Sequence, residues 1–358
     1  MKILLIGDTQ IANHKAMGGP MENGSNLRCR EILEALDYQI GYARQQFGIE
    51  AIIQVGDFFD LARPSAALYT AVIELIKRHP VEWHILAGNH DIASYDAPTA
   101  ISPLKYLANV HVYEKPTAVV IGDVLWSMVP YTGPSCEDAI RAAREELGQR
   151  SPRFCVCHYG LVNNATVPRT DLFQLSYDKV APSGPFQSWF FGHEHGSLAH
   201  KFANWRSYRS IGSFCDYDFG SGCEILHSSL VIDTQAAHVS CCAHFRTPVP
   251  MFADLTTVPN DLYFDDGVFW RASRASALYA RVRPEHAERA DFFRRAGMLR
   301  DFVVLPADAI ATLHAATAQE EGSYMECVAD ELTNNNLEPV QLAAVWELCD
   351  QFMQEASS

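Results

Sequence analysis

The chain has 358 residues, of which 48% are hydrophobic and 20% charged, and its formal net charge is −15. This length accommodates two domains, and this composition buries a sizeable core, which excludes a globally disordered chain. An evenly spread negative charge would also exclude nucleic-acid binding, because neutralising phosphates requires clustered Lys and Arg.

The charge is not evenly spread. Residues 301–358 contain eleven Asp or Glu and no Lys or Arg, so residues 1–300 carry only −4 (28 basic against 32 acidic residues). Within them, residues 271–300 hold eight Arg and three acidic residues. A nucleic-acid function therefore has to be judged from the local distribution of charge.

The N-terminal apolar run before Asp8 is too short for a signal-peptide core or a membrane-spanning helix. The ten Cys show no CxxC spacing, which disfavours a structural zinc site and favours reduced thiols. We therefore expect a cytoplasmic protein without membrane association.

Short apolar runs alternate with helical stretches in the first part of the chain. In chain order, the expected elements are strand 2–7, helix 29–47, strand 51–55, helix 64–79 and strand 81–87. This order predicts a parallel sheet with helices on its faces, so the fold class is α/β.

Further strands and one helix follow. The strands are expected at 117–122, 124–130, 154–158, 188–192, 206–211, 224–232 and 237–246, and the helix at 135–148. The density of strands after residue 185 predicts a second sheet that packs on the first.

Pro248 and Pro250 mark a domain boundary. Beyond them we expect strand 277–283, helix 284–297 and strand 301–305, and then an amphipathic helix at 338–354. The predicted domains are residues 1–247, a small α+β unit at 248–306 and an acidic helical region at 307–358.

Polar residues follow five of the predicted strands at the point where each strand ends. In open α/β sheets, sites lie at the carboxyl ends of the strands. Carboxylate, amide and imidazole groups together suit Mn²⁺, Fe²⁺ or Zn²⁺, and Asp57 is the natural carboxylate to bridge two ions. The residues at these ends are Asp8, Gln10, Asp57, Asn89, His90, His158, His193 and His195.

Three motifs, GDxxD at 56–60, GNHD at 88–91 and GHEH at 192–195, occur in this order. They resemble the calcineurin-like metallophosphoesterase superfamily. The segment GDFFDLARPSAALYTAVI (56–73) followed by LAGNHD resembles the SbcD family, the nuclease subunit of the SbcC–SbcD complex. The resemblance covers about residues 1–230. It implies a four-layer sandwich of two mixed β-sheets flanked by helices, with a small α+β capping domain and C-terminal helices.

Carried over residue by residue, the resemblance implies two half-sites for divalent cations, with Mn²⁺ expected and Mg²⁺ as the alternative. The first half-site would take Asp8, Gln10, Asp57 and His195. The second would take Asp57, Asn89, His158 and His193. His90 would protonate the leaving sugar oxygen or stabilise its charge. For Asp60, a helix-capping or supporting role weighs as much as a catalytic one.

Gln10 departs from the resemblance, because that family has His at this position. An amide oxygen is neutral and a poorer donor than imidazole towards transition metals, so the first ion is expected to bind more weakly, to be Mn²⁺ or Mg²⁺ rather than Zn²⁺, or to be held through water. A degenerate site that no longer cleaves is the alternative.

The expected function is a Mn²⁺-dependent DNA exonuclease or endonuclease in DNA recombination, repair, replication or degradation. DNA and an SbcC-like ATPase are the partners implied by the resemblance, which also leaves a homodimer open. The competing functions are a phosphodiesterase or phosphatase on small substrates and a non-cleaving scaffold subunit.

Two features C-terminal to the motifs each have two interpretations. Arg271, Arg274, Arg281 and Arg283 are either DNA contacts or charges on a solvated surface. The apolar stripe of helix 338–354 either packs on its own domain or docks on the ATPase.

Overall fold

The computed structural model describes residues 1–15, 17–94, 97–162, 174–176, 188–193, 195, 199–201, 207–216, 228–235, 242–246, 251–254, 256, 278–297, 299–306 and 309. The chain divides into two compact units, Met1–Val162 with Asp171–Leu305 and Asn163–Thr170 with Pro306–Ser358. All elements below belong to the first unit. The domain boundaries predicted after residues 247 and 306 stay predictions, and helix 338–354 lies outside the described residues.

The first sheet has six strands. In spatial order they are β16 (Cys242–Arg246), β15 (Ser228–Asp233), β1 (Lys2–Ile6), β4 (Ala51–Gln54), β5 (Glu82–Leu86) and β6 (Val110–Tyr113). The four strands from β1 to β6 are parallel, which confirms the predicted parallel arrangement. β15 runs antiparallel to β1. β15 therefore belongs to the first sheet and not to the second. Its pairing satisfies the backbone groups at the edge of β1.

The second sheet also has six strands. In spatial order they are β13 (Ala199–Lys201), β14 (Ser207–Ser210), β12 (Ser188–Phe191), β9 (Phe154–Cys157), β8 (Val124–Val129) and β7 (Thr117–Ile121). The inner four strands are parallel, and the two edge strands are antiparallel to their neighbours. This sheet begins at residue 117 and so includes strands well before residue 185.

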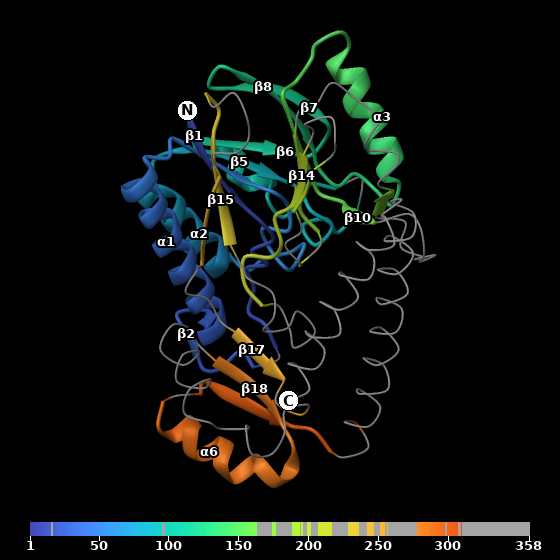
Figure 1. Cartoon of the computed structure of the whole chain (residues 1–358). Helices are drawn as coiled ribbons and strands as arrows, with labels where there is room; N and C mark the ends of the chain where they lie inside the picture. The colour runs from blue at the N-terminus through green and yellow to red at the C-terminus, as the bar shows by residue number, and fades with distance from the viewer. Residues whose placement is uncertain are drawn as a thin grey trace, which may run out of the picture. The chain divides into compact units, whose positions relative to one another are not determined.

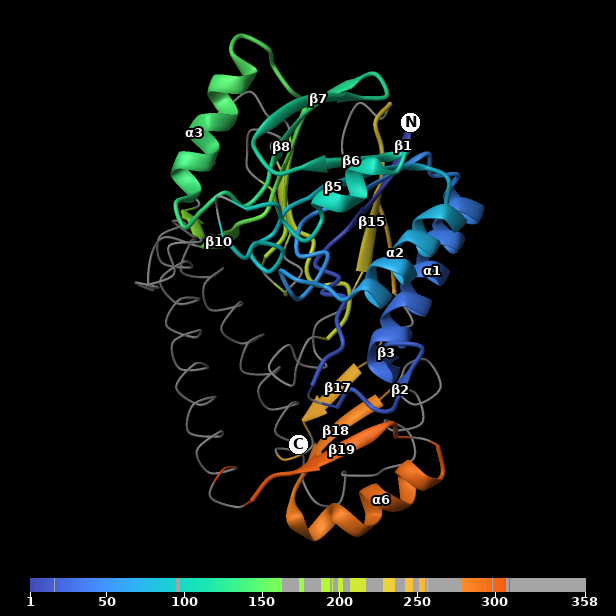
Figure 2. The same ribbon diagram turned by 180° about the vertical axis from the view of Figure 1, so that it is seen from behind.

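Helices cover the outer faces of both sheets (Figures 1 and 2). α1 (Leu27–Phe47) and α2 (Ala66–Arg78) pack on the first sheet, and α3 (Cys136–Leu147) packs on the second. The side chains of Asn26, Ser65 and Ser135 accept a backbone N–H of the first helical turn and so fix where these helices begin.

The buried apolar side chains form three clusters, one for each interface between layers. The first joins α1 and α2 to the first sheet, the second lies between the sheets around Ile53, Trp126 and Phe190, and the third joins the second sheet to α3. These interfaces define the four-layer α/β sandwich, which confirms the expected fold class.

A small parallel sheet follows the sandwich in the chain. It contains β17 (Met251–Asp254), β18 (Leu278–Val282) and β19 (Asp301–Val304), and the short helix η2 (Pro284–His286) and α6 (Ala287–Arg295) connect the last two strands. The strands and helix expected after residue 277 are confirmed, whereas β17 was not predicted.

Several short elements were also not predicted. They are β2 (Met21–Glu22), β3 (Ser25–Asn26), η1 (Ser102–Tyr106), β6, β10 (Gly160–Val162), β11 (Gln174–Ser176) and β13. Elements of two to five residues are too short to show a hydrophobic period.

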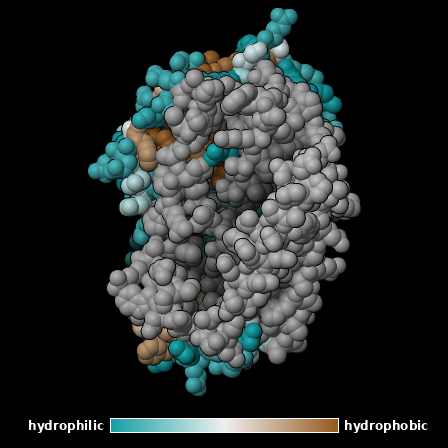
Figure 3. All heavy atoms as spheres, in the orientation of Figure 1, coloured by the Kyte–Doolittle hydropathy of each residue, from teal (hydrophilic) through white to brown (hydrophobic). Residues whose placement is uncertain are grey.

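In Figure 3, the coloured residues at the outer margins of the visible face are mostly hydrophilic. Within the described ranges, no helix is long and apolar enough to cross a membrane.

Candidate metal centre

Five parallel strands from both sheets deliver the predicted residues to one region. Asp8 and Gln10 follow β1, Asp57 follows β4, and Asn89 and His90 follow β5. His158 follows β9 in the second sheet, and His193 and His195 follow β12. The hydrogen bonds and short contacts among these side chains join the two sheets at the carboxyl ends of their strands.

The residues predicted for the second half-site converge closely. His158 Nε2 lies 3.3 Å from Asp57 Oδ2 and 3.1 Å from Asn89 Oδ1. His193 Nδ1 lies 2.9 Å from the same Asn89 oxygen. One ligand atom from each of Asp57, His158 and His193 lies within 4.8 Å of the other two. The geometry therefore fits one divalent cation, while ligation itself stays a prediction.

The residues predicted for the first half-site are also brought together. His195 Nε2 lies 3.8 Å from Asp8 Oδ2 and 3.2 Å from Gln10 Nε2. Rotating the Gln10 amide by half a turn exchanges its nitrogen and oxygen, which then gives an oxygen donor at that point. Asp8 accepts the backbone N–H of His193 at 3.1 Å, so this carboxylate also contacts the segment that carries the second half-site.

Burial and mutual charge make this cluster suited to a cation. Burial raises the pKa of Asp8 to about 8, although the nearby imidazole of His158 opposes the rise. Burial also works against a charged His158, but Asp57 and Asp8 raise its pKa to about 10. A divalent cation would favour ionised carboxylates and neutral imidazoles, which are the forms that bind metal. The donor set therefore fits the expected ions.

The backbone of the centre is strained. Gln10, Asp57 and His193 have φ values of 44°, 50° and 74°, in the left-handed region that non-glycine residues seldom adopt. The Gln10 N–H donates to the Asp57 carbonyl at 3.0 Å, which ties two of these residues together. Such strain persists where the surroundings fix it, and it is often found at functional sites.

Two motif glycines make room for the candidate ligands. A Cβ atom added at Gly56 would lie 2.1 Å from His158 Nδ1. One added at Gly88 would lie 2.1 Å from Asp57 Oδ1. Any side chain at these positions would therefore displace a predicted ligand.

Asp91, the last residue of GNHD, had no predicted role. It is 0% exposed, and its carboxylate accepts the backbone N–H groups of Gly88 at 2.9 Å, Phe59 at 3.0 Å and Phe58 at 3.3 Å. It thereby holds the loop after β4 against the loop after β5. Its place within the motif was the only signal in the sequence.

His90 lies beside the cluster and contacts two carboxylates. Its backbone N–H donates to Asp57 Oδ1 at 2.8 Å, and its imidazole Nδ1 lies 3.0 Å from Asp60 Oδ1. The hydrogen bond with Asp60 raises the pKa of His90 to about 9, against the opposing effect of burial. Ser65 rather than Asp60 caps α2, so the helix-capping role expected for Asp60 is wrong, while its contact with His90 fits a supporting role.

The four arginines predicted to contact DNA are only partly described. Arg271 and Arg274 lie outside the described residues, and Arg281 belongs to β18. Arg283 follows β18, and its Nε donates to the Thr256 carbonyl at 2.8 Å, so part of its guanidinium supports the fold. DNA contact by these residues stays a prediction.

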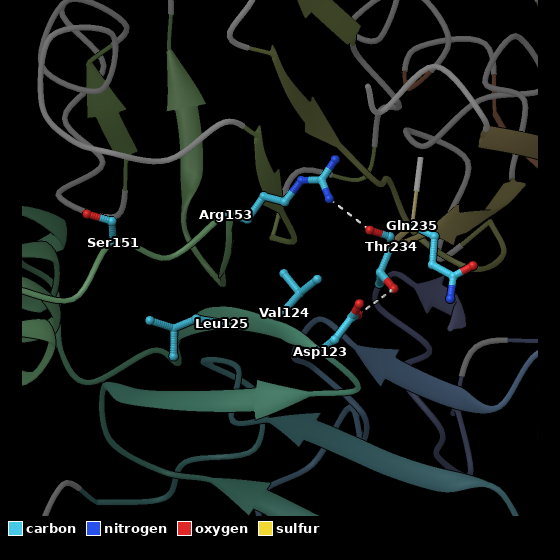
Figure 4. A pocket seen from close by; sticks show the side chains of 7 residues that line it. All are labelled: Asp123, Val124, Leu125, Ser151, Arg153, Thr234 and Gln235. Carbon is cyan, nitrogen blue, oxygen red and sulfur yellow. Dashed lines mark hydrogen bonds between the residues drawn. The ribbon is translucent and has the colours of Figure 1, made fainter. Parts of the chain in front are cut away.

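A pocket lies at the other end of the second sheet. It is lined by Asp123, Val124, Leu125, Ser151, Arg153, Thr234 and Gln235 (Figure 4). Arg153 and Val124 stand where β9 and β8 begin, whereas His158 follows the end of β9. The pocket is therefore separate from the candidate metal centre.

A protein-family model and a curated protein match parts of this chain. A family model described as calcineurin-like phosphoesterase matches residues 1–197. Exonuclease subunit 1 of Enterobacteria phage T4 is 28% identical over 169 residues, which are 45% of this chain and 46% of that protein. The chain thus spans about half the length of the curated relative that it matches.

Two solved structures are similar at 13% identity. A dimetal phosphatase from Danio rerio gives a TM-score of 0.40 over 59% of this chain and 87% of its own. A 5'-nucleotidase precursor from Thermus thermophilus also gives 0.40, over 69% of this chain and 55% of its own.

Proposed function

This chain belongs to the calcineurin-like phosphoesterase family, and on that premise we propose that it is a DNA nuclease that uses two divalent cations. The observation that carries the proposal is the convergence of Asp57, Asn89, His158 and His193 at the strand ends. The similarity to a phage exonuclease subunit favours a polynucleotide over a small phosphoester as the substrate.

The residues of the chain take distinct roles in this proposal. Asp8, Gln10, Asp57 and His195 would hold one cation, and Asp57, Asn89, His158 and His193 would hold the other. When bound, the cations supply Lewis-acid activation of water and neutralise charge on the phosphate. His90 holds the proton that the leaving group needs.

The reaction is a hydrolysis without a covalent intermediate. A water oxygen forms a bond to phosphorus and gives up one proton to solvent, the bond from phosphorus to the sugar oxygen breaks, and that oxygen receives a proton from His90, which solvent then reprotonates. His90 is suited to donate this proton because its ring is one-third exposed beside the buried carboxylate of Asp57 and Asp60 holds its pKa at about 9.

Three parts of the proposal rest on the resemblance of residues 56–91 to SbcD. They are the preference for Mn²⁺ with Mg²⁺ as the alternative, an SbcC-like ATPase as partner, and a role in DNA recombination, repair, replication or degradation. A homodimer is the corresponding proposal for the oligomeric state.

The test measures cleavage of single- and double-stranded DNA with Mn²⁺, and also Mn²⁺-dependent melting. Asp57→Asn should abolish cleavage and the rise in melting temperature, because it removes the carboxylate between the half-sites. Asp138→Asn is the matched control, since Asp138 is an exposed carboxylate on α3 that pairs with Arg141. Full cleavage by Asp57→Asn would overturn the assignment. Hydrolysis of small phosphoesters with no action on DNA would instead identify a phosphatase.

A further inference from the structure

A second histidine lies behind Asp60, because two segments continue side by side after β1 and β4. Ile11 forms a parallel bridge with Phe59, and the Ile11 N–H donates to the Phe58 carbonyl at 3.0 Å. Thr9 Oγ1 donates to the same carbonyl at 2.9 Å. The segment that carries His14 is therefore aligned with the loop that carries Asp60.

His14 is buried and anchored on both sides. Its Nε2 lies 3.1 Å from the Gln10 carbonyl, and since a carbonyl only accepts, the imidazole is the donor. Its own carbonyl accepts the Asn26 side-chain amide at 2.8 Å. The His14 side chain is 6% exposed, so the ring has a fixed place beneath the surface.

The other edge of the His14 ring faces Asp60. His14 Nδ1 lies 3.6 Å from Asp60 Oδ2, a packing contact slightly longer than a hydrogen bond. The second oxygen of the same carboxylate lies 3.0 Å from His90 Nδ1. Asp60 thus lies between two imidazole rings, of which only His90 is exposed enough to reach a substrate.

We infer that His14 is a positioning residue, which holds the Asp60 carboxylate in the orientation that fixes the ring of His90. Without a side chain of this size, as in His14→Ala, Asp60 is free to rotate about its terminal torsion, which is a soft one. His90 then loses its fixed contact with Asp60, and its other ring nitrogen no longer has a fixed orientation. The inference rests on the proposed function in one respect, namely that His90 assists the leaving group.

The activity test compares two leaving groups. A sugar alkoxide needs a proton as it departs from DNA, whereas the nitrophenolate of thymidine 5'-(4-nitrophenyl phosphate) needs none. With Mn²⁺, His14→Ala should lower kcat on DNA about tenfold with little change in KM, a fraction of what general acid catalysis contributes. Hydrolysis of the nitrophenyl ester should change by less than about twofold.

Conservative and distant variants complete the set. His14→Gln retains an amide donor for the Gln10 carbonyl and side-chain bulk beside Asp60, so it should restore most of the rate on DNA. His111→Gln is the control, because His111 is a half-exposed histidine on β6 that pairs with Glu82. Equal losses on both substrates, or an unchanged rate on DNA, would overturn the inference.

A measurement without activity separates this inference from the proposed function. In metal-free protein labelled with ¹⁵N in the imidazole rings, the His90 Nδ1 resonance should shift in His14→Ala towards that of a solvated ring and return in His14→Gln. An unshifted resonance refutes the role of His14 whatever the substrate proves to be. A wild-type chain that is inert on DNA refutes the proposed function instead.

Discussion

Gln10 differs from the other candidate ligands in its chemistry but not in its placement. Its backbone has a φ of 44°, close to the 50° of Asp57, and its amide nitrogen lies 3.2 Å from His195 Nε2. The backbone is therefore shaped to present a ligand, while the amide is a weaker donor than imidazole towards transition metals. We interpret this as a change in the affinity of the first half-site rather than its loss.

Gln10→His should strengthen binding of the first cation about tenfold, within the range over which metal affinity responds to single residues. The measurement is a titration with Mn²⁺ followed by electron paramagnetic resonance, which counts bound ions directly. Gln235→His serves as the control, because Gln235 is exposed in the pocket remote from the strand ends. Unchanged affinity for both cations would show that Gln10 does not take part in binding.

At the scale of elements, the strands that carry the centre were predictable from local sequence. β1, β4, β5, β9 and β12 are apolar runs that end in Gly-containing motifs or in His, so the strand and its ligand appear together. β6 was missed because its sequence, VHVY, has an exposed His111 within only four residues.

Relations between distant segments were not predictable. The pairing of β15 with β1 joins residues more than two hundred positions apart, and no local pattern records it. The contact of His14 with Asp60 likewise depends on two loops that continue in parallel beyond their strands. Asp91 belongs to a recognised motif, yet its role appears only with the backbone N–H groups that it accepts.

The loop after β5 should not tolerate a side chain at Gly88. Gly88→Ala would place a Cβ atom 2.1 Å from Asp57 Oδ1 and 2.2 Å from the Asp57 nitrogen, so the Asp57 loop must move. We expect a loss of about 1–3 kcal/mol in the free energy of unfolding and a loss of Mn²⁺ binding. Denaturant titration and Mn²⁺ titration measure the two effects.

Gly41→Ala is the matched control for Gly88→Ala. Gly41 lies inside α1, and a Cβ atom there has only His79 Cε1 nearby, at 3.9 Å. Alanine in a helix interior should raise the free energy of unfolding by about 0.5–1 kcal/mol. If both variants gained stability, the close approach at Gly88 would have no energetic weight.

At the scale of the whole first unit, two kinds of interface differ in chemistry. Apolar clusters join the layers of the sandwich, whereas polar and aromatic contacts join the small sheet to α1. The Arg28 guanidinium lies 4.5 Å above the Phe252 ring, and Phe252 stacks on Tyr279. Tyr279 Oη donates to Glu31 Oε2 at 2.8 Å, and Arg300 Nε lies 2.8 Å from Glu31 Oε1.

The small sheet also connects to the candidate metal centre through residues 211–216. The Phe252 N–H donates to Asp216 Oδ2 at 2.7 Å. Earlier in the same segment, Ser213 N donates to the His195 carbonyl at 3.1 Å and Phe214 N to the Asp8 carbonyl at 2.8 Å. Residues 213–216 thus connect the backbone of the first half-site to β17 by hydrogen bonds at both ends of the segment.

Glu31 is therefore the residue whose loss should loosen the small sheet. Glu31→Ala leaves the hydroxyl of Tyr279, which is 1% exposed, without its acceptor, and it also removes the partner of Arg300 Nε. We expect the free energy of unfolding to fall by about 1–3 kcal/mol, with the loss of stability mainly in the small sheet. Hydrogen exchange should show lower protection of the amides of β18, while β4 in the sandwich keeps its protection.

Glu34→Ala, one turn further along α1 at an exposed position, should change the free energy of unfolding by less than about 0.5 kcal/mol. This control separates the loss of the Glu31 contacts from any general effect of removing a carboxylate from α1. Equal loss of protection in β4 and β18 would mean that the two sheets unfold as one cooperative unit. Unchanged protection of β18 in Glu31→Ala would mean that apolar contacts, rather than Glu31, hold the small sheet in place.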